Sequence, residues 1–99
     1  MTQIERIEYM ENIFDKTELS VKKLQDAIGE YKTAIKYIKE LEAYYESDTW
    51  RQDYEDDENG KIPENLKRGV LSEDGIYSLL EENTELIENI SQLARDICD

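Results

Sequence analysis

The residues best suited to chemistry are the carboxylates of the stretch "EDDENGKIPENL", which begins at Glu55. With Gly60 in the sixth position of a calcium-binding loop, Asp57 and Asn59 occupy ligand positions three and five. The first position, however, holds Glu55, and the twelfth, which should be a bidentate Glu, is Leu66. The pattern therefore favours a solvated acidic segment that attracts cations loosely over a specific calcium site.

A second group of carboxylates lies in "EENTE", as Glu81, Glu82 and Glu85. Carboxylates spaced in this way on a helix can hold magnesium in nucleotide pyrophosphatases, where a second helix supplies further ligands. Here the helical phase turns Glu81 and Glu85 away from the apolar stripe, and residues 1–46 contain no matching Glu-x-x-Asp. A solvated helix face explains the group better, and a metal-dependent enzyme acting on phosphate esters is the alternative.

Other catalytic groups are scarce. The chain has no histidine, which is the commonest general base and transition-metal ligand. Its one cysteine, Cys98, has neither a histidine to activate it nor a second cysteine to pair with, as expected in a reducing compartment. The sequence therefore predicts no catalytic residue, no metal site and no cofactor.

The charge of the chain restricts its partners. Twelve basic residues stand against 25 acidic ones, for a net charge of −13, and residues 72–99 are the most acidic part. Such a chain repels nucleic acids and anionic membranes.

It also lacks a signal peptide and a membrane-spanning run, so we expect a soluble, cytoplasmic protein. A basic stripe at Lys32, Lys36 and Lys39 is expected to pair with the acidic C-terminal segment, or to dock an acidic partner.

A seven-residue apolar repeat runs through residues 1–46 and predicts one long amphipathic helix. With Ile7 at heptad position a, positions a, d and g form a stripe wider than a two-stranded seam. "DKTE", from Asp15 to Glu18, resembles a capping box that could start a new helix. The unbroken phase from Phe14 to Val21 favours a continuous helix.

A second amphipathic helix is predicted over residues 72–98. Ser72 is a suitable N-cap, and Leu71 and Ile76 have the spacing of a hydrophobic staple. Apolar residues then recur every three or four positions up to Ile97. Asn83 interrupts this stripe, either as a buried residue that fixes register or partner number, or as a solvated residue at its rim.

Residues 47–71 form the predicted connector. Trp50 and Tyr54, four residues apart, indicate a short helical turn. Pro63 and Gly69 have the positions expected at the start and just past the end of another. The acidic residues between these turns are expected to cap helix ends or to pair with basic residues, namely Arg51, Lys67 and Arg68.

The sequence as a whole predicts a single all-α domain over residues 1–99, with the two helices in an antiparallel hairpin. A 44-residue helix is about 65 Å long, whereas its partner of 26 residues covers only about 40 Å. The long helix must therefore fold back into a three-helix monomer or bury its excess against a second copy, and we favour an antiparallel homodimer. The residues expected to form the self-association stripe are Ile7, Phe14, Val21, Leu24, Ile28, Ile35, Ile38, Leu79, Leu86, Ile90 and Leu93.

A resemblance covers nearly the whole chain, and its specific part runs from Tyr44 to Asn83. The residues that carry it are Trp50, Asp53, Asp57, Glu58, Gly60, Pro63, "LKRGVLSED" from Leu66 to Asp74, Tyr77, Leu79 and Leu80. This pattern resembles a family of short, acidic, helical proteins of Gram-positive bacteria that is catalogued as a domain of unknown function. The resemblance implies that the connector is a specified structural element, and it implies no activity or ligand.

The sequence alone thus leads to a non-enzymatic protein–protein interaction module that self-associates. It identifies no other protein partner. Besides the metal-dependent enzyme, a further alternative is an acidic decoy that occupies a basic site on a nucleic-acid-binding protein.

Overall fold

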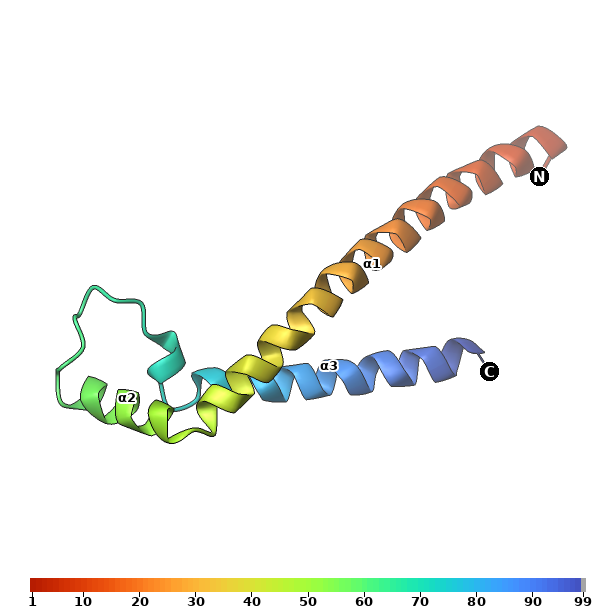
Figure 1. The fold of residues 1–99 in the computed structure, drawn as a ribbon. Helices are drawn as coiled ribbons and strands as arrows, with labels where there is room; N and C mark the ends of the chain where they lie inside the picture. Colours follow the sequence, from red (N-terminus) through yellow and green to blue (C-terminus); the bar gives the residue numbers. More distant parts are fainter. Residues whose placement is uncertain (99) are drawn as a thin grey trace. The chain divides into compact units, whose positions relative to one another are not determined.

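The computed structural model describes residues 1–98, which form α-helices and one short 3₁₀ helix and contain no β-strand (Figure 1). The elements are α1 (Gln3–Tyr45), α2 (Asp48–Glu58), the 3₁₀ helix η1 (Gly69–Leu71) and α3 (Gly75–Cys98). The predicted all-α class, with a long N-terminal helix and a shorter C-terminal one, is confirmed. The chain divides into two units, Met1–Lys36 and a second that begins at Tyr37.

The first unit is the N-terminal part of α1. Its start is capped reciprocally, because the Thr2 hydroxyl accepts from the backbone N–H of Glu5 at 3.2 Å and the Thr2 N–H donates to the Glu5 carboxylate at 3.3 Å. The helix runs unbroken through Asp15 and Glu18, so the prediction of a continuous helix is confirmed. All residues from 1 to 30 are exposed.

The second unit contains the end of α1, followed by α2, η1 and α3. Helix α2 begins at the N-cap Ser47, whose hydroxyl accepts from the Trp50 N–H at 3.1 Å. It ends at Glu58 and is closed by Gly60, whose φ is 73°. The Gly60 N–H donates to the Asp57 carbonyl and the Lys61 N–H to the Asp56 carbonyl. The helical turn predicted around Trp50 is therefore a complete, capped helix of 11 residues.

The rest of the connector differs from the prediction. The Leu66 N–H donates to the Pro63 carbonyl at 3.1 Å, which closes a β-turn where a helical turn was expected. Gly69 begins η1, and Ser72 is not the N-cap of the second helix. Its hydroxyl instead donates to the Gly69 carbonyl at 2.8 Å, and α3 starts at Gly75. Ser72 therefore closes the 3₁₀ helix that precedes α3.

The buried hydrophobic residues of the described chain are Leu71 and Ile76, which are 7% and 3% exposed. They are the two residues that the sequence predicts as a hydrophobic staple, and they flank the start of α3. Leu41, near the end of α1, lines one depression together with Ile76 and Leu79 of α3. Within the second unit, the chain thus reverses between the end of α1 and the start of α3, and the buried residues lie at this reversal (Figure 1).

Candidate interaction surfaces

Trp50 is the central residue of the connector. Its indole N–H donates to the Val70 carbonyl at 2.8 Å, across 20 residues of sequence. Its ring meets Tyr45 edge-on, with centroids 4.9 Å apart, and stacks on Tyr54 at 5.3 Å. One side chain therefore joins the end of α1, helix α2 and the 3₁₀ helix.

Arg68 fixes the other side of the connector loop. Its Nε lies 3.2 Å from the Asp57 carboxylate, and the two side chains are only 33% and 24% exposed. A terminal guanidinium nitrogen also donates to the carbonyls of Pro63, at 3.0 Å, and Ile62, at 3.4 Å. The predicted pairing of Arg68 with the acidic stretch is thus confirmed, and a partly buried Arg–carboxylate contact holds the loop against α2.

The remaining acidic residues of α2 do not converge on a common point. Asp56 pairs with Lys61 at 3.8 Å, Asp48 pairs with Arg51 at 3.3 Å, and Asp53 accepts from the Tyr44 hydroxyl at 2.6 Å. The candidate calcium frame begins inside α2, whose backbone is helical there and does not form a loop. Among residues 1–98 no three His, Cys, Asp or Glu side chains are grouped as metal ligands.

The acidic face of α3 is solvated. Glu81 accepts from the Tyr77 hydroxyl at 3.1 Å, and Glu82 and Glu85 are exposed. Asn83, on the apolar side of the helix, is half-buried. This face holds a hydrogen-bonded surface pair in place of the cluster of carboxylates that a magnesium site requires.

Three tyrosines are held in their protonated form. Burial, the hydrogen bond to Asp53 and the charge of that carboxylate raise the pKa of Tyr44 to about 12. A hydrogen bond to Glu58, burial and the charges of Glu58 and Glu73 raise the pKa of Tyr54 to about 12. The hydrogen bond to Glu81 and its charge also raise the pKa of Tyr77. At neutral pH these hydroxyls are donors that stabilise structure, and they are poor nucleophiles.

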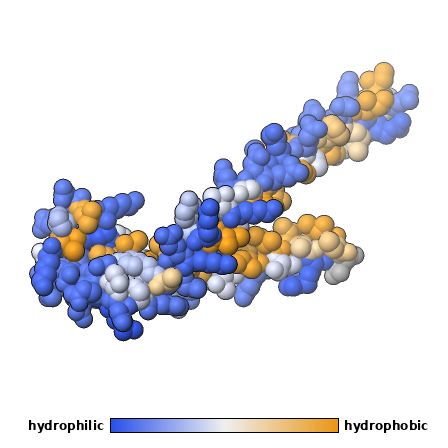
Figure 2. Space-filling view, in the orientation of Figure 1, coloured by the Kyte–Doolittle hydropathy of each residue, from blue (hydrophilic) through white to orange (hydrophobic). Residues whose placement is uncertain are grey.

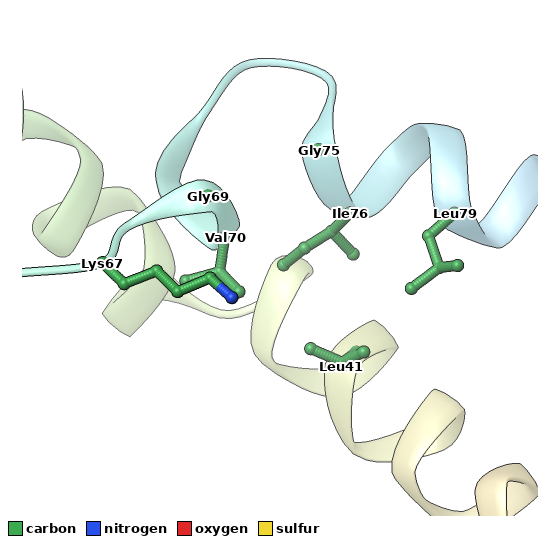
Figure 3. Close-up of a pocket in the computed structure, with 7 residues that line it drawn as sticks. All are labelled: Leu41, Lys67, Gly69, Val70, Gly75, Ile76 and Leu79. Atoms are coloured by element: carbon green, nitrogen blue, oxygen red, sulfur yellow. The ribbon is translucent and has the colours of Figure 1, made fainter.

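A depression of about 320 Å³ lies where the chain reverses, and Figure 3 shows its walls. It is lined by Leu41, Lys67, Gly69, Val70, Gly75, Ile76 and Leu79. Ile76 and Leu79 extend from α3 toward Leu41, and the Lys67 side chain extends along the Val70 side (Figure 3). The lining offers apolar contact and one ammonium group, without a carboxylate, hydroxyl or thiol for acid–base or nucleophilic chemistry.

Large apolar side chains are exposed along both long helices, and Figure 2 shows them gathered along α3 and at intervals along α1. Ile38 is half-buried. The other residues predicted for the self-association stripe are between 39% and 59% exposed, namely Ile7, Phe14, Val21, Leu24, Ile28, Ile35, Leu79, Leu86, Ile90 and Leu93. Single exposed apolar residues are ordinary, but a periodic series of large ones along a helix is typical of a binding surface.

Sequence reasoning missed the contacts that fix the connector. It expected neither the Trp50 bond to the Val70 carbonyl nor the bond between Tyr44 and Asp53. The available signal was the distinctive pattern of this segment, since Trp50, Asp53, Asp57, Gly60 and Pro63 all belong to it. The predicted pairing of the lysine stripe with the acidic C-terminal helix stays a prediction.

None of the described helices is both long and apolar enough to cross a membrane. No curated protein and no solved structure matches the chain. A family model described as Domain of unknown function (DUF4298) matches residues 7–93. Because this match covers most of the sequence, the chain belongs to the DUF4298 family.

Proposed function

We propose that this DUF4298 protein is a non-enzymatic protein–protein interaction module that self-associates through the apolar stripes of α1 and α3. One observation carries the proposal: large apolar residues recur at heptad spacing along both helices and are about half exposed. Burying the exposed half of such a side chain gains roughly 1 kcal/mol, so a stripe of several provides a substantial driving force for association.

The form of these surfaces favours a helix as the partner. A small ligand needs a concave site with converging polar groups, whereas the stripes are linear and follow the 3-4 spacing of helix-to-helix contacts. The depression at Leu41 and Ile76 is too poor in polar groups to support catalysis.

The partner that fits these stripes is a second copy of the same chain. Symmetric homodimers are the commonest oligomers, and a heptad stripe is complementary to another stripe of the same kind. The net charge of −13 opposes association at long range, so the apolar contacts must provide the affinity. An acidic decoy would instead bind a basic protein through charge, and its binding would be lost at moderate salt.

Light scattering and sedimentation over a range of concentrations test the proposal. The wild-type chain is expected to have twice the mass of one chain and to dissociate on dilution. Ile28→Asp in α1 and Leu86→Asp in α3 place a charge within the stripes, and each is expected to shift the protein toward monomer.

Leu19→Asp is the matched control for α1, because Leu19 is 55% exposed but lies at heptad position f, away from the stripe. Ser91→Asp serves in the same way for α3. Both controls are expected to remain dimeric, with circular dichroism confirming that every variant is helical. A wild-type protein that stays monomeric at all concentrations would remove the proposed self-association.

A further inference from the structure

The charged residues beside the stripe of α1 are ordered along the helix. With Ile7 at position a, the e positions that follow it are Glu11, Glu18, Gln25, Lys32 and Lys39. The order is acid, acid, amide, base, base, so the series is complementary to its own reverse. All five side chains are exposed, and none of them forms an ion pair within residues 1–98.

We infer that α1 pairs with α1 of a second copy in antiparallel orientation, in the register that sets Val21 against Leu24 of the other chain. The inference rests on the proposed self-association and adds its geometry. Charges at positions e and g set the orientation of paired helices more than they set affinity.

In this register, the paired core residues are apolar or aromatic except in the layer that contains Thr17. From the centre outward, Val21 faces Leu24, Thr17 faces Ile28, and Phe14 faces Tyr31 of the second copy. Met10 and Ile35 follow, and Ile7 and Ile38 complete the series. Each layer occurs twice because the pairing is two-fold symmetric, so the seam uses the whole predicted stripe of α1.

Registers shifted by one heptad in either direction would be less stable. A shift of one heptad in one direction brings Met10 against Glu42, which occupies the next a position after Ile35. That pairing would bury a carboxylate against an apolar side chain. The opposite shift shortens the seam and sets Glu18 beside Glu18 of the other chain. The pairing of Val21 with Leu24 avoids both costs.

The flanks of the seam then differ from each other. In an antiparallel pair, position e lies beside e of the other chain, so Glu11 meets Lys32 and Lys39, and Glu18 meets Gln25 and Lys32. Position g lies beside g, where Ile13 meets Ala34 and Ser20 meets Ala27. One flank is therefore charged and complementary, and the other consists of apolar and small side chains that widen the buried surface.

A parallel pair would lose most of this charge complementarity. Position e would then lie beside g of the other chain, and the g residues after Ile7 are uncharged, namely Ile13, Ser20, Ala27, Ala34 and Leu41. Arg6, at the g position just before Ile7, would lie beside Glu11, but Glu18, Lys32 and Lys39 would have no opposite charge beside them. The order of the e residues thus selects the antiparallel orientation.

Spin-label distances test the orientation directly. In a Cys98→Ser background, Asn12→Cys and Asp26→Cys each carry one label at heptad position f, on the outer face of α1. At a rise of 1.5 Å per residue, the antiparallel register separates the two copies of residue 12 by about 32 Å along the axis, and those of residue 26 by only about 10 Å. Double electron–electron resonance should therefore give the longer distance for Asn12→Cys.

Each result has a distinct meaning. Similar short distances at both sites indicate a parallel pair and overturn the inference, while self-association stands. A dimer whose labels show neither pattern pairs through another surface, such as α3, and also overturns it. A monomer removes the proposed function itself.

Charge reversal provides an independent check on the e positions. Glu11→Lys with Glu18→Lys sets lysine beside lysine, and is expected to weaken dimerisation at least about tenfold at low salt. Adding Lys32→Glu and Lys39→Glu should restore it. Glu8→Lys with Asp15→Lys is the matched control, because it makes the same change in net charge at position b. It should leave dimerisation equal or stronger, and an equal loss in both pairs would contradict the register.

Discussion

The first unit and the connector of the second unit are stabilised in different ways. In the first unit, residues 1–30 are all exposed, and a capping box at Thr2 and Glu5 is its main side-chain anchor. In the connector, side chains distant in sequence hold one another, as Trp50 does with the Val70 carbonyl. Leu71 is buried there, Ile76 is buried at the adjoining start of α3, and the Arg68–Asp57 pair is largely shielded.

The difference indicates where each part finds its partners. The connector is held by hydrogen bonds, an ion pair and the buried Leu71 within one chain, so its stability should not depend on protein concentration. The stripe of α1 presents half-exposed apolar residues, so its helix should gain stability when a second molecule covers them. Mutations in the two regions should therefore respond differently to dilution.

The largest effect is expected for Ile76→Ala. Ile76 is 3% exposed, and removal of a buried isoleucine side chain beyond Cβ costs about 3 kcal/mol. Trp50 is the sole tryptophan and lies in the connector, so its fluorescence reports unfolding of this region in urea. The loss in the free energy of unfolding should be the same at low and high protein concentration.

Val21→Ala is the comparison variant for the stripe. Its effect on helix content, followed by circular dichroism, should grow as the protein concentration is raised through the dimerisation range and vanish in the monomer. If the cost of Ile76→Ala also varied with concentration, the connector would depend on association and the contrast between the two regions would be wrong.

An intermediate effect, with opposite signs in the two regions, is expected for glycine-to-alanine changes. A Cβ at Gly75 would collide with the Gly69 carbonyl oxygen, so Gly75→Ala should lower stability by about 2 kcal/mol. A Cβ at Gly29 meets open space on the solvent side of α1, and Gly29→Ala should raise helix stability by roughly 0.5–1 kcal/mol. Thermal unfolding followed by circular dichroism measures both changes, and a destabilising Gly29→Ala would indicate that this face of α1 is covered.

The helices were predictable because their signals are periodic. The heptads from Ile7 to Ile38 predict the continuous α1. Leu71 and Ile76 are both buried, but they do not form the predicted staple around Ser72, because α3 begins at Gly75. The stretch between Pro63 and Ser72 was not predictable from local pattern. Its helical-turn signature is overridden by bonds from outside the segment, chiefly from Trp50 to Val70 and from Arg68 to Asp57.

The helix faces that carry the stripe residues were predictable, whereas the contacts of the neighbouring connector were not. Periodicity alone identifies the stripe residues, since an apolar residue every three or four positions must share a helix face. The bond between Tyr44 and Asp53 was not predictable, because it requires the chain to turn at Ser47 before α2 begins. Such contacts depend on the geometry of the chain reversal, which no local spacing encodes.

The smallest effect concerns the pH dependence of the connector through Tyr44. Its hydroxyl donates to Asp53 at 2.6 Å, and burial together with that carboxylate raises its pKa to about 12, from about 10 in an unfolded chain. Because the folded pKa is the higher one, the contribution of this group to stability is complete below pH 10 and is lost as the pH rises from 10 to 12.

Tyr44→Phe removes the hydroxyl and is expected to lower the free energy of unfolding by about 1 kcal/mol at pH 8. The difference between wild type and variant should shrink toward pH 12, because the wild type then loses the same contribution by ionisation. Urea unfolding of both proteins at each pH measures this difference, and the effect of the raised pKa of Tyr54 cancels between them. Tyr9→Phe, at an exposed site on α1, should change stability little at either pH. A constant difference from pH 8 to pH 12 would show that the Tyr44 hydroxyl does not ionise differently in the folded and unfolded chains.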